Sequence, residues 1–342
     1  MMPKFKNINS AIILNLFLFI FFPIISPASI ENKESIKFIY ITDLNLYPTP
    51  LENARQKNEY EKKDGILLYE TQAVFQEIIR YLNQKVEFDC VFFGGNNISE
   101  IQGAQNSIKN LNIWHLFLDM ASELKTAFYI VIGKNETKAL PNNEIIHTLS
   151  ELGIDSKVTW WHKKIRNFLF VSLDSVLFFN SNYHAKVQID WLKKILISNL
   201  NIPTVIFLHE PIITEEGSVI NTTNINSLLT LIEQYPQVKL IISGNNYLNR
   251  IKPVKNIVHI LSSSPSVYPC SFKLIELSDD VVKVKSISIP LKGIVKKAEI
   301  SLTESDRAKL FIKNSAKPFK YYVLGSKSDQ DVELTFKDLK NR

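Results

Sequence analysis

Short apolar runs alternate with amphipathic segments from residue 36 to residue 244, and this alternation restricts the chain to a small set of folds. The runs are Ile36–Thr42 (IKFIYIT), Val86–Phe93 (VEFDCVFF), Ala127–Ile132, Asn167–Leu173, Thr204–Leu208 and Val238–Ile242. Such runs, bounded by Gly, Pro or polar residues, are typical of buried strands. The segments between them have helical spacing, which predicts helices over Tyr69–Leu82, Ile108–Leu124, Asn143–Leu152, His184–Ser198 and Thr223–Tyr235.

After residue 244 the pattern changes to strands without helices between them, at Ile257–Leu261, Phe272–Leu277 and Val281–Ile289. Alternating strands and helices indicate helices packed on a largely parallel sheet, and the later run indicates a second, antiparallel or mixed sheet. The sequence therefore predicts an α/β protein in which two mixed sheets lie face to face with helices outside, a four-layer α/β/β/α sandwich.

Net charge is +6 over 342 residues, and most of it lies after residue 290. The segment 291–342 holds 12 Lys and Arg against 7 Asp and Glu. The rest of the chain has no broad basic face, so we expect no nucleic-acid partner. We predict a core domain over 36–290 and a solvated basic extension over 291–342, with strands at Lys320–Leu324 and Val332–Phe336.

The first 29 residues have the layout of a secretory signal peptide. Two lysines and no acid precede an apolar stretch, Ala11–Ile25, and the small residues Ser26, Ala28 and Ser29 follow it. The stretch is shorter than the roughly 20 residues that span a bilayer, and Pro23 interrupts it. We therefore expect a secreted or extracytoplasmic protein without a membrane partner after cleavage; the alternative is an uncleaved membrane anchor.

Two cysteines, Cys90 and Cys270, each lie among apolar residues. In an exported chain they could form a disulfide, but their surroundings favour two separate buried thiols. Neither belongs to a Cys/His cluster with zinc spacing.

Polar residues follow the predicted strands where each strand ends. They are Asp43-Leu44-Asn45, Gly95-Asn96-Asn97, Gly133-Lys134-Asn135-Glu136, His209-Glu210-Pro211 and Gly244-Asn245-Asn246-Tyr247. The carboxyl ends of parallel strands meet at one edge of a sheet, so we expect these loops to form one crevice.

The order of these motifs resembles that of the calcineurin-like metallophosphoesterases, in particular the secreted acid phosphatase and acid sphingomyelinase-like branch. The family pattern is Asp-x-His, Gly-Asp, Gly-Asn-His-Asp/Glu, a lone His and Gly-His-x-His, each after a strand. In that family these side chains hold two metal ions that activate a water and bind a phosphate ester. The resemblance covers about residues 36–289 and implies the metallo-dependent phosphatase fold.

Two positions keep the family residue: Asp43 matches the first aspartate, and His209 matches the lone histidine. At the remaining positions the residues differ from the family pattern. Asn45 replaces a metal-binding histidine, Asn96 replaces the bridging aspartate, and Lys134 replaces the metal-binding asparagine. Asn135 replaces the catalytic histidine, Glu136 stands for the family acid, and Asn245 and Tyr247 replace the last two histidines. Two divalent ions need carboxylates to neutralise them, and most are missing here.

We therefore predict that Asp43 and His209 are vestigial metal ligands, that no catalytic residue remains, and that Lys134 pairs with Asp43 in place of a metal charge. The expected function is that of an inactive phosphoesterase-fold protein that binds an unknown protein or a phosphorylated small molecule and needs no cofactor. One alternative is an active metal-dependent phosphoesterase with an atypical or single-metal site, using Mn, Zn or Fe, with His162 and His184 as substrate-side groups. Another is an adhesion protein using Trp160 and Trp161, although such a pair more often packs inside.

Overall fold

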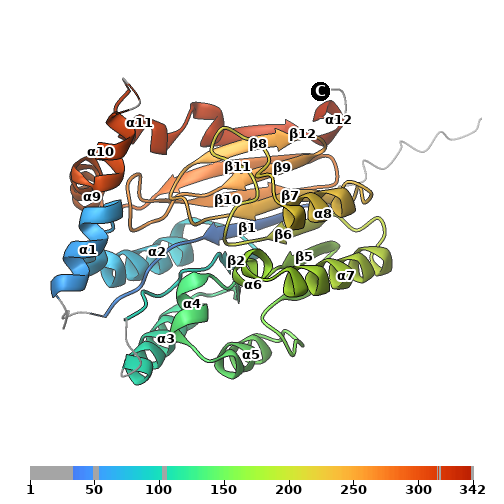
Figure 1. The fold of residues 1–342 in the computed structure, drawn as a ribbon, viewed down its shortest axis with the longest axis horizontal. Helices are drawn as coiled ribbons and strands as arrows, with labels where there is room; N and C mark the ends of the chain where they lie inside the picture. The colour runs from blue at the N-terminus through green and yellow to red at the C-terminus, as the bar shows by residue number, and fades with distance from the viewer. Residues whose placement is uncertain (1–33, 49–53, 102–105, 314, 316, 340–342) are drawn as a thin grey trace, which may run out of the picture. The chain divides into compact units, whose positions relative to one another are not determined.

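The computed structural model describes residues 34–48, 54–101, 106–313, 315 and 317–339, and of residues 54–58 it describes only the backbone (Figure 1). From Glu34 onward the chain forms one compact unit. The signal peptide predicted over residues 1–29 lies outside the described residues. Within the part that is described, no helix combines the length and the apolar character needed to cross a membrane.

The first sheet has six strands in the order β12-β11-β10-β1-β2-β3. Its members are β1 (Ile36–Ile41), β2 (Cys90–Phe93), β3 (Ala127–Ile130), β10 (Ser271–Leu277), β11 (Val281–Ser288) and β12 (Asp331–Thr335). Strands β1, β2 and β3 are parallel, whereas β10, β11 and β12 join them by antiparallel pairing. The sheet is therefore mixed, with the parallel half coming from the N-terminal part of the chain.

The second sheet also has six strands, in the order β4-β5-β6-β7-β9-β8. Its members are β4 (Trp161–Ile165), β5 (Phe168–Ser172), β6 (Thr204–Phe207), β7 (Val238–Ser243), β8 (Arg250–Val254) and β9 (Ile257–Leu261). The four central strands are parallel, and the edge strands β4 and β8 are antiparallel. Both edge strands carry charged residues, and the sequence pattern did not predict them.

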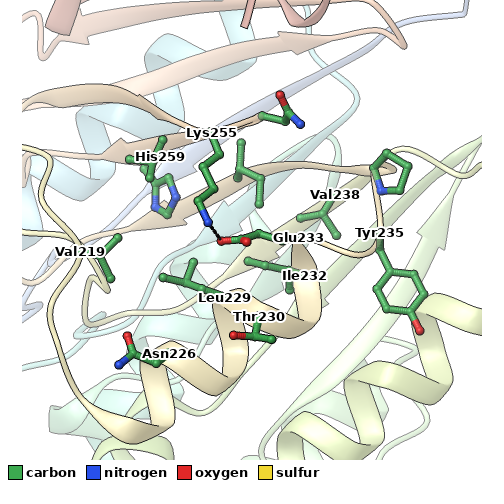
Figure 2. A pocket seen from close by; sticks show the side chains of 14 residues that line it. Val219, Asn226, Leu229, Thr230, Ile232, Glu233, Tyr235, Val238, Lys255 and His259 are labelled. Carbon is green, nitrogen blue, oxygen red and sulfur yellow. Dashed lines mark hydrogen bonds and ion pairs between the residues drawn. The ribbon is translucent and has the colours of Figure 1, made fainter. Parts of the chain in front are cut away.

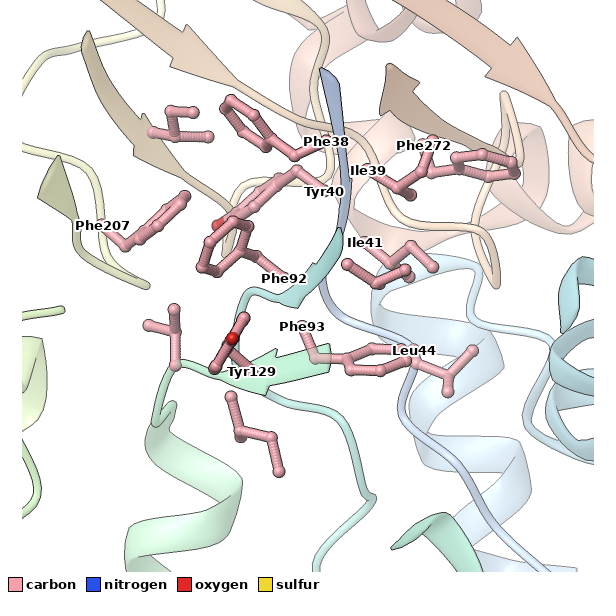
Figure 3. Close-up of a cluster of buried hydrophobic side chains, with 14 of the residues drawn as sticks. Phe38, Ile39, Tyr40, Ile41, Leu44, Phe92, Phe93, Tyr129, Phe207 and Phe272 are labelled. Carbon is pink, nitrogen blue, oxygen red and sulfur yellow. The ribbon is translucent and has the colours of Figure 1, made fainter. Parts of the chain in front are cut away.

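The two sheets pack face to face through aromatic side chains (Figure 3). Phe38 of the first sheet lies edge-on to Phe170 of the second, with ring centroids 5.4 Å apart, and Tyr40 stacks on Phe207 at 5.7 Å. Phe92 contacts both Phe170 and Phe207. Large apolar rings that exclude water from both inner faces account for the sandwich.

Helices cover the outer face of each sheet (Figure 1). On the first sheet, α2 (Thr71–Lys85) and α3 (Ser107–Ser122) place Phe75 and Phe117 against Phe93 of β2. On the second, α7 (Asn182–Ser198) and α8 (Thr223–Ile232) form one apolar cluster with β5, β6 and β7. The remaining helices before residue 290 are α1 (Ala54–Asp64), η1 (Leu68–Glu70), α4 (Lys134–Ala139), α5 (Asn142–Glu151) and α6 (Ser175–Asn180). The predicted four-layer arrangement of two mixed sheets flanked by helices is confirmed.

The segment after residue 290 is folded rather than a solvated tail. It contains α9 (Lys292–Glu304), α10 (Asp306–Ile312), α11 (Phe319–Leu324), η3 (Lys327–Asp329), β12 and α12 (Phe336–Leu339). Leu302, Phe319 and Val323 bury their side chains in a cluster shared with Leu248 and Ile66, and Ala298 packs in the main core. The strand predicted over Lys320–Leu324 is wrong, because this stretch is helical, whereas the strand predicted over Val332–Phe336 is confirmed as β12.

Asp329 joins this segment to both sheets. One of its carboxylate oxygens accepts the N–H of Ile251 in β8, at 3.0 Å, and lies 3.4 Å from the Lys252 Nζ. Its backbone carbonyl accepts a hydrogen bond from the Lys273 Nζ of β10 at 3.0 Å. Lys273 is fully buried and also donates to the Ser286 Oγ. The C-terminal segment is thus held by the second sheet through a carboxylate and by the first through a buried lysine.

Cys90 and Cys270 are both buried free thiols, as their apolar surroundings indicated. Burial raises the pKa of the Cys270 thiol to about 12, so this thiol stays protonated.

Candidate functional site

The polar residues after the parallel strands meet in one crevice. Asp43 and Asn45 follow β1, Asn96 follows β2, His209 follows β6 and Asn245 follows β7. The N–H of Asp43 donates to the Gly95 carbonyl and that of Asn45 to the Asn96 carbonyl, both at 2.9 Å, so the first two loops lie side by side. The convergence predicted from the strand ends is therefore found in the structure.

Asp43 is at the centre of the crevice and is fully buried. Its Oδ2 accepts hydrogen bonds from the Asn245 N–H at 2.7 Å and from the Thr42 Oγ1 at 3.0 Å. Its Oδ1 accepts from the Asn96 Nδ2 at 3.1 Å. Burial raises the pKa of Asp43, and the neighbouring His209 opposes that rise. Both carboxylate oxygens are thus engaged by groups of the protein itself.

The imidazole of His209 lies beside the Asp43 carboxylate. Its Nδ1 lies 2.7 Å from the carbonyl oxygen of Gly94, an acceptor, so Nδ1 carries the hydrogen. The opposite ring nitrogen, Nε2, lies 3.5 Å from the Oδ1 of Asp43, is buried, and has no hydrogen-bond partner among the described residues. The imidazole is therefore oriented toward the carboxylate by a backbone carbonyl on its far side.

Asn45, Asn96 and Asn135 hydrogen-bond to one another and to the backbone. The Asn45 Nδ2 donates to the Asp43 carbonyl at 2.9 Å, and the Asn135 Nδ2 donates to the Asn45 Oδ1 at 3.1 Å and to the Ile98 carbonyl at 2.8 Å. The Asn96 Oδ1 accepts the Asn135 N–H at 2.9 Å. The amide oxygens of Asn45 and Asn96 therefore both accept hydrogen bonds from Asn135, a member of the same network.

Glu136 holds two of the loops together. It is fully buried, and its carboxylate accepts four backbone N–H groups: those of Asn96 at 3.0 Å, Gly133 at 2.9 Å, Asn97 at 2.6 Å and Ile98 at 3.3 Å. Burial raises the pKa of this carboxyl, while the backbone donors and His209 act in the opposite direction. A carboxylate that is saturated by backbone donors positions the loops and has little capacity left for a ligand.

Lys134 does not occupy the position that the sequence suggested. It is the first residue of the short helix α4, rather than part of a loop, and it is exposed, whereas Asp43 is fully buried. The side chain that faces Asp43 is His209, and the expected Lys134–Asp43 pair is not found among the ion pairs of the described residues. Lys134 lies instead at the exposed rim, where it lines the crevice cavity.

The rim of the crevice is polar and encloses a cavity of about 590 Å³. Lys134, Asn135, Asn245 and Tyr247 line it, together with residues of α1 and Arg307 of α10. The Arg307 guanidinium donates to the Asn246 carbonyl at 2.7 Å and lies over the Tyr247 ring at 5.8 Å. Burial and the negative charge of Asp43 raise the pKa of Tyr247. Tyr247 is thus held under an arginine that comes from the C-terminal segment.

Residues that the motifs did not indicate also shape the crevice. The hydroxyls of Ser264 and Ser266 donate to the Asp43 carbonyl at 2.6 and 3.1 Å and hold its left-handed backbone (φ 56°). At Gly244 a Cβ would lie 2.6 Å from the Asp43 Oδ2 and closer still to Thr42, so no larger residue fits. The run of serines after the strand Ile257–Leu261 could have indicated Ser264 and Ser266. Arg307 was missed because the basic composition of residues 291–342 predicted a solvated extension.

The other histidines lie away from the crevice. His162 packs its ring against Trp191, and the Nδ1 of His184 lies 3.0 Å from the Ser181 Oγ. Neither lines the crevice cavity. Trp160 and Trp161 are both buried, and the Trp161 indole donates to the Ile130 carbonyl at 2.9 Å, so this pair packs inside rather than serving a contact surface.

The side chains present do not fit a dinuclear metal centre. In the described part of the chain no three His, Cys, Asp or Glu side chains gather as a metal-binding group. An N–H group of Asn96 points at the Asp43 Oδ1, where a cation would need a lone pair, and Glu136 is bound by backbone amides. Neutral amides cannot supply the charge that two divalent ions require.

Three comparisons relate the chain to known proteins. No family model matches it. It is 25% identical over 242 residues to a 3',5'-cyclic-nucleotide phosphodiesterase of Nostoc sp. (strain PCC 7120), covering 70% of this chain and 81% of the relative.

Solved structures share its fold. A dimetal phosphatase from Danio rerio superimposes with a TM-score of 0.55 at 13% identity, covering 73% of this chain and 95% of that one. GAP50, the anchor in the inner membrane complex of Plasmodium, superimposes with a TM-score of 0.50 at 15% identity, covering 75% and 85%. The chain therefore has the metallo-dependent phosphatase fold that its resemblance to the calcineurin-like metallophosphoesterases predicted.

Proposed function

We propose that this chain is an exported, catalytically inactive member of the phosphoesterase fold that acts by binding or scaffolding. The observation that supports the proposal is the state of the Asp43 carboxylate. Its two oxygens accept hydrogen bonds from Thr42, Asn96 and Asn245, and these donors compete with a metal ion for the carboxylate lone pairs. A binding role is also consistent with the described function of GAP50 as an anchor, a protein of the same fold.

The partner in this proposal is a protein or a phosphorylated small molecule that contacts the polar rim. The rim has four basic side chains and three acidic ones, so its net charge is small; they are Lys63, Lys134, Lys138 and Arg307, and Glu59, Asp64 and Glu100. Such a surface suits a partner of mixed polarity rather than a polyanion.

The experiment is a metal analysis of the purified chain followed by phosphoesterase assays with added Mn²⁺, Zn²⁺ or Fe²⁺. The substrates are p-nitrophenyl phosphate, bis-p-nitrophenyl phosphate and a 3',5'-cyclic nucleotide. We expect no stoichiometric metal and no turnover. Metal-dependent turnover that Asp43→Asn abolishes and Asp119→Asn preserves would refute the proposal, because Asp119 is exposed on α3, outside the crevice.

The second candidate function is an active phosphoesterase with a single metal. One observation favours it: the Nε2 of His209 is buried, faces the Asp43 Oδ1 and has no hydrogen-bond partner in the part of the chain that the structure describes. These two side chains could hold one ion, and the Nostoc relative is a phosphodiesterase. The assay above separates the two functions, since this one requires metal-dependent turnover.

A further inference from the structure

A second cavity, of about 510 Å³, lies on the helix side of the second sheet (Figure 2). Helix α8, the turn between β8 and β9, and the chain around Val219 enclose it. Its volume is within the range of pockets that hold small molecules. None of its lining residues belongs to the crevice described above.

His259 is the buried polar group of this cavity. It lies in the middle of β9, paired with Ile241 of β7 and Lys252 of β8. Side chains alternate along a strand, so His259 shares a face with Ile257, which packs in the cluster under α7 and α8. Only 2% of its surface is exposed, and its Nε2 has no hydrogen-bond partner among the described residues. An unpaired buried polar atom is costly, so it points to a group that would bind there.

The other walls of the cavity are mostly apolar. Leu229, Ile232, Val219 and Val238 line it, and Figure 2 shows their side chains around His259. At its rim the Lys255 Nζ lies 2.5 Å from the Glu233 Oε1 and neutralises it. Burial lowers the pKa of His259 to about 4, so the imidazole is neutral near pH 7. A charged ligand group would therefore find no uncompensated opposite charge inside.

We propose that this cavity binds a small apolar molecule that carries a hydroxyl group, with the hydroxyl at the His259 Nε2. A neutral imidazole presents one donor and one acceptor, and a hydroxyl can match either one because it both donates and accepts. The apolar walls supply the remaining affinity by excluding water from the body of the ligand. This site does not depend on the function proposed for the crevice.

The test compares three probes that share one ring system: 2-naphthol, naphthalene and 2-naphthoate. Binding to the full chain is measured by titration at pH 7, with NMR shifts to locate the site. We expect 2-naphthol to bind with one-to-one stoichiometry, roughly tenfold more tightly than naphthalene, which is the usual effect of one net hydrogen bond. The carboxylate of 2-naphthoate should weaken binding relative to 2-naphthol.

Two variants assign the site, and one serves as the control. His259→Leu removes the polar group, and Val219→Trp fills the cavity while leaving His259 in place; each should weaken 2-naphthol binding at least roughly tenfold. His115→Leu alters a histidine on α3, outside the cavity, and should leave binding unchanged. Equal affinity for naphthol and naphthalene, absence of saturable binding, or binding that neither folded variant weakens would overturn the proposal.

Discussion

The Nε2 of His209 lies 3.5 Å from the Oδ1 of Asp43, and neither side chain is exposed to solvent. The same oxygen accepts a hydrogen bond from the Asn96 Nδ2. A buried carboxylate is therefore compensated by an imidazole and an amide of the protein. In the calcineurin-like family that the sequence resembles, the expectation at this place is metal cations bridged by a carboxylate at the position of Asn96.

Replacing the amide by a carboxylate tests this relationship. Asn96→Asp would place two carboxylates about 3 Å apart in a buried site, which should destabilise the protein by about 2 kcal/mol or more. Thermal unfolding is then measured with and without about 1 mM Mn²⁺. An ion bound between the two carboxylates should restore the stability of Asn96→Asp. Asn96→Ala is the matched control: it should be destabilised without responding to Mn²⁺. Equal responses of both variants would contradict the interpretation.

Loss of the Glu136 charge should destabilise the fold. In Glu136→Gln one oxygen becomes an NH₂ group that faces backbone N–H donors, leaving buried donors without an acceptor. We expect a loss of about 3 kcal/mol in the free energy of unfolding, measured with urea. Glu151→Gln, on an exposed side chain of α5, should change stability by less than about 0.5 kcal/mol. A small effect at Glu136 would show that the loops are held by other contacts.

Lys273 should make stability depend on alkaline pH. Burial lowers its pKa from 10.5 to about 7. Between these values the unfolded chain binds a proton that the folded chain does not, so stability should rise as pH increases from 7 to about 10.5 and be lost as pH falls back. The full contribution is up to about 5 kcal/mol.

Comparing variants isolates this contribution. Unfolding free energies of the wild type, Lys273→Met and Lys285→Met would be measured from pH 7 to about pH 10. The difference between wild type and Lys273→Met should grow with pH, whereas Lys285 is exposed on β11 and should give a constant difference. A constant difference for Lys273→Met as well would mean that its ammonium remains charged in the fold.

Asp329 should be the most sensitive residue of the C-terminal segment. Asp329→Ala removes the acceptor for the Ile251 N–H, for the Ser326 N–H and for the Ser326 hydroxyl. We expect a loss of about 3 kcal/mol and lower hydrogen-exchange protection in β8. Asp331→Ala, two residues further on and exposed, is the control. Unchanged protection in β8 would indicate that the segment does not support the second sheet.

The sequence predicted the sheets and the crevice for a common reason. Apolar runs such as Thr204–Leu208 have to be buried as strands. The residue after each run must then lie at the carboxyl end of its strand, as His209 does. This rule depends only on strand direction. It therefore located the residues after β1, β2, β6 and β7 without specifying their partners.

The rule could not predict which side chains turn inward. Lys134 follows a strand, but a helix begins there, and the lysine is exposed. In the C-terminal segment the charges concealed a helical pattern, since Ala298 and Leu302, and likewise Phe319 and Val323, are four residues apart and buried. In that segment the spacing of the apolar residues indicates the structure better than the net charge does.

Five of the crevice residues, Asp43, Asn45, Asn96, Asn245 and Tyr247, have left-handed backbone angles, with φ between 50° and 65°. Among residues with a side chain, Asn and Asp tolerate this conformation best. Main-chain geometry thus accounts for asparagine at positions 45, 96 and 245 without any role for amide chemistry toward a ligand. A search for the biological ligand should accordingly give these amides little weight and begin with the exposed rim.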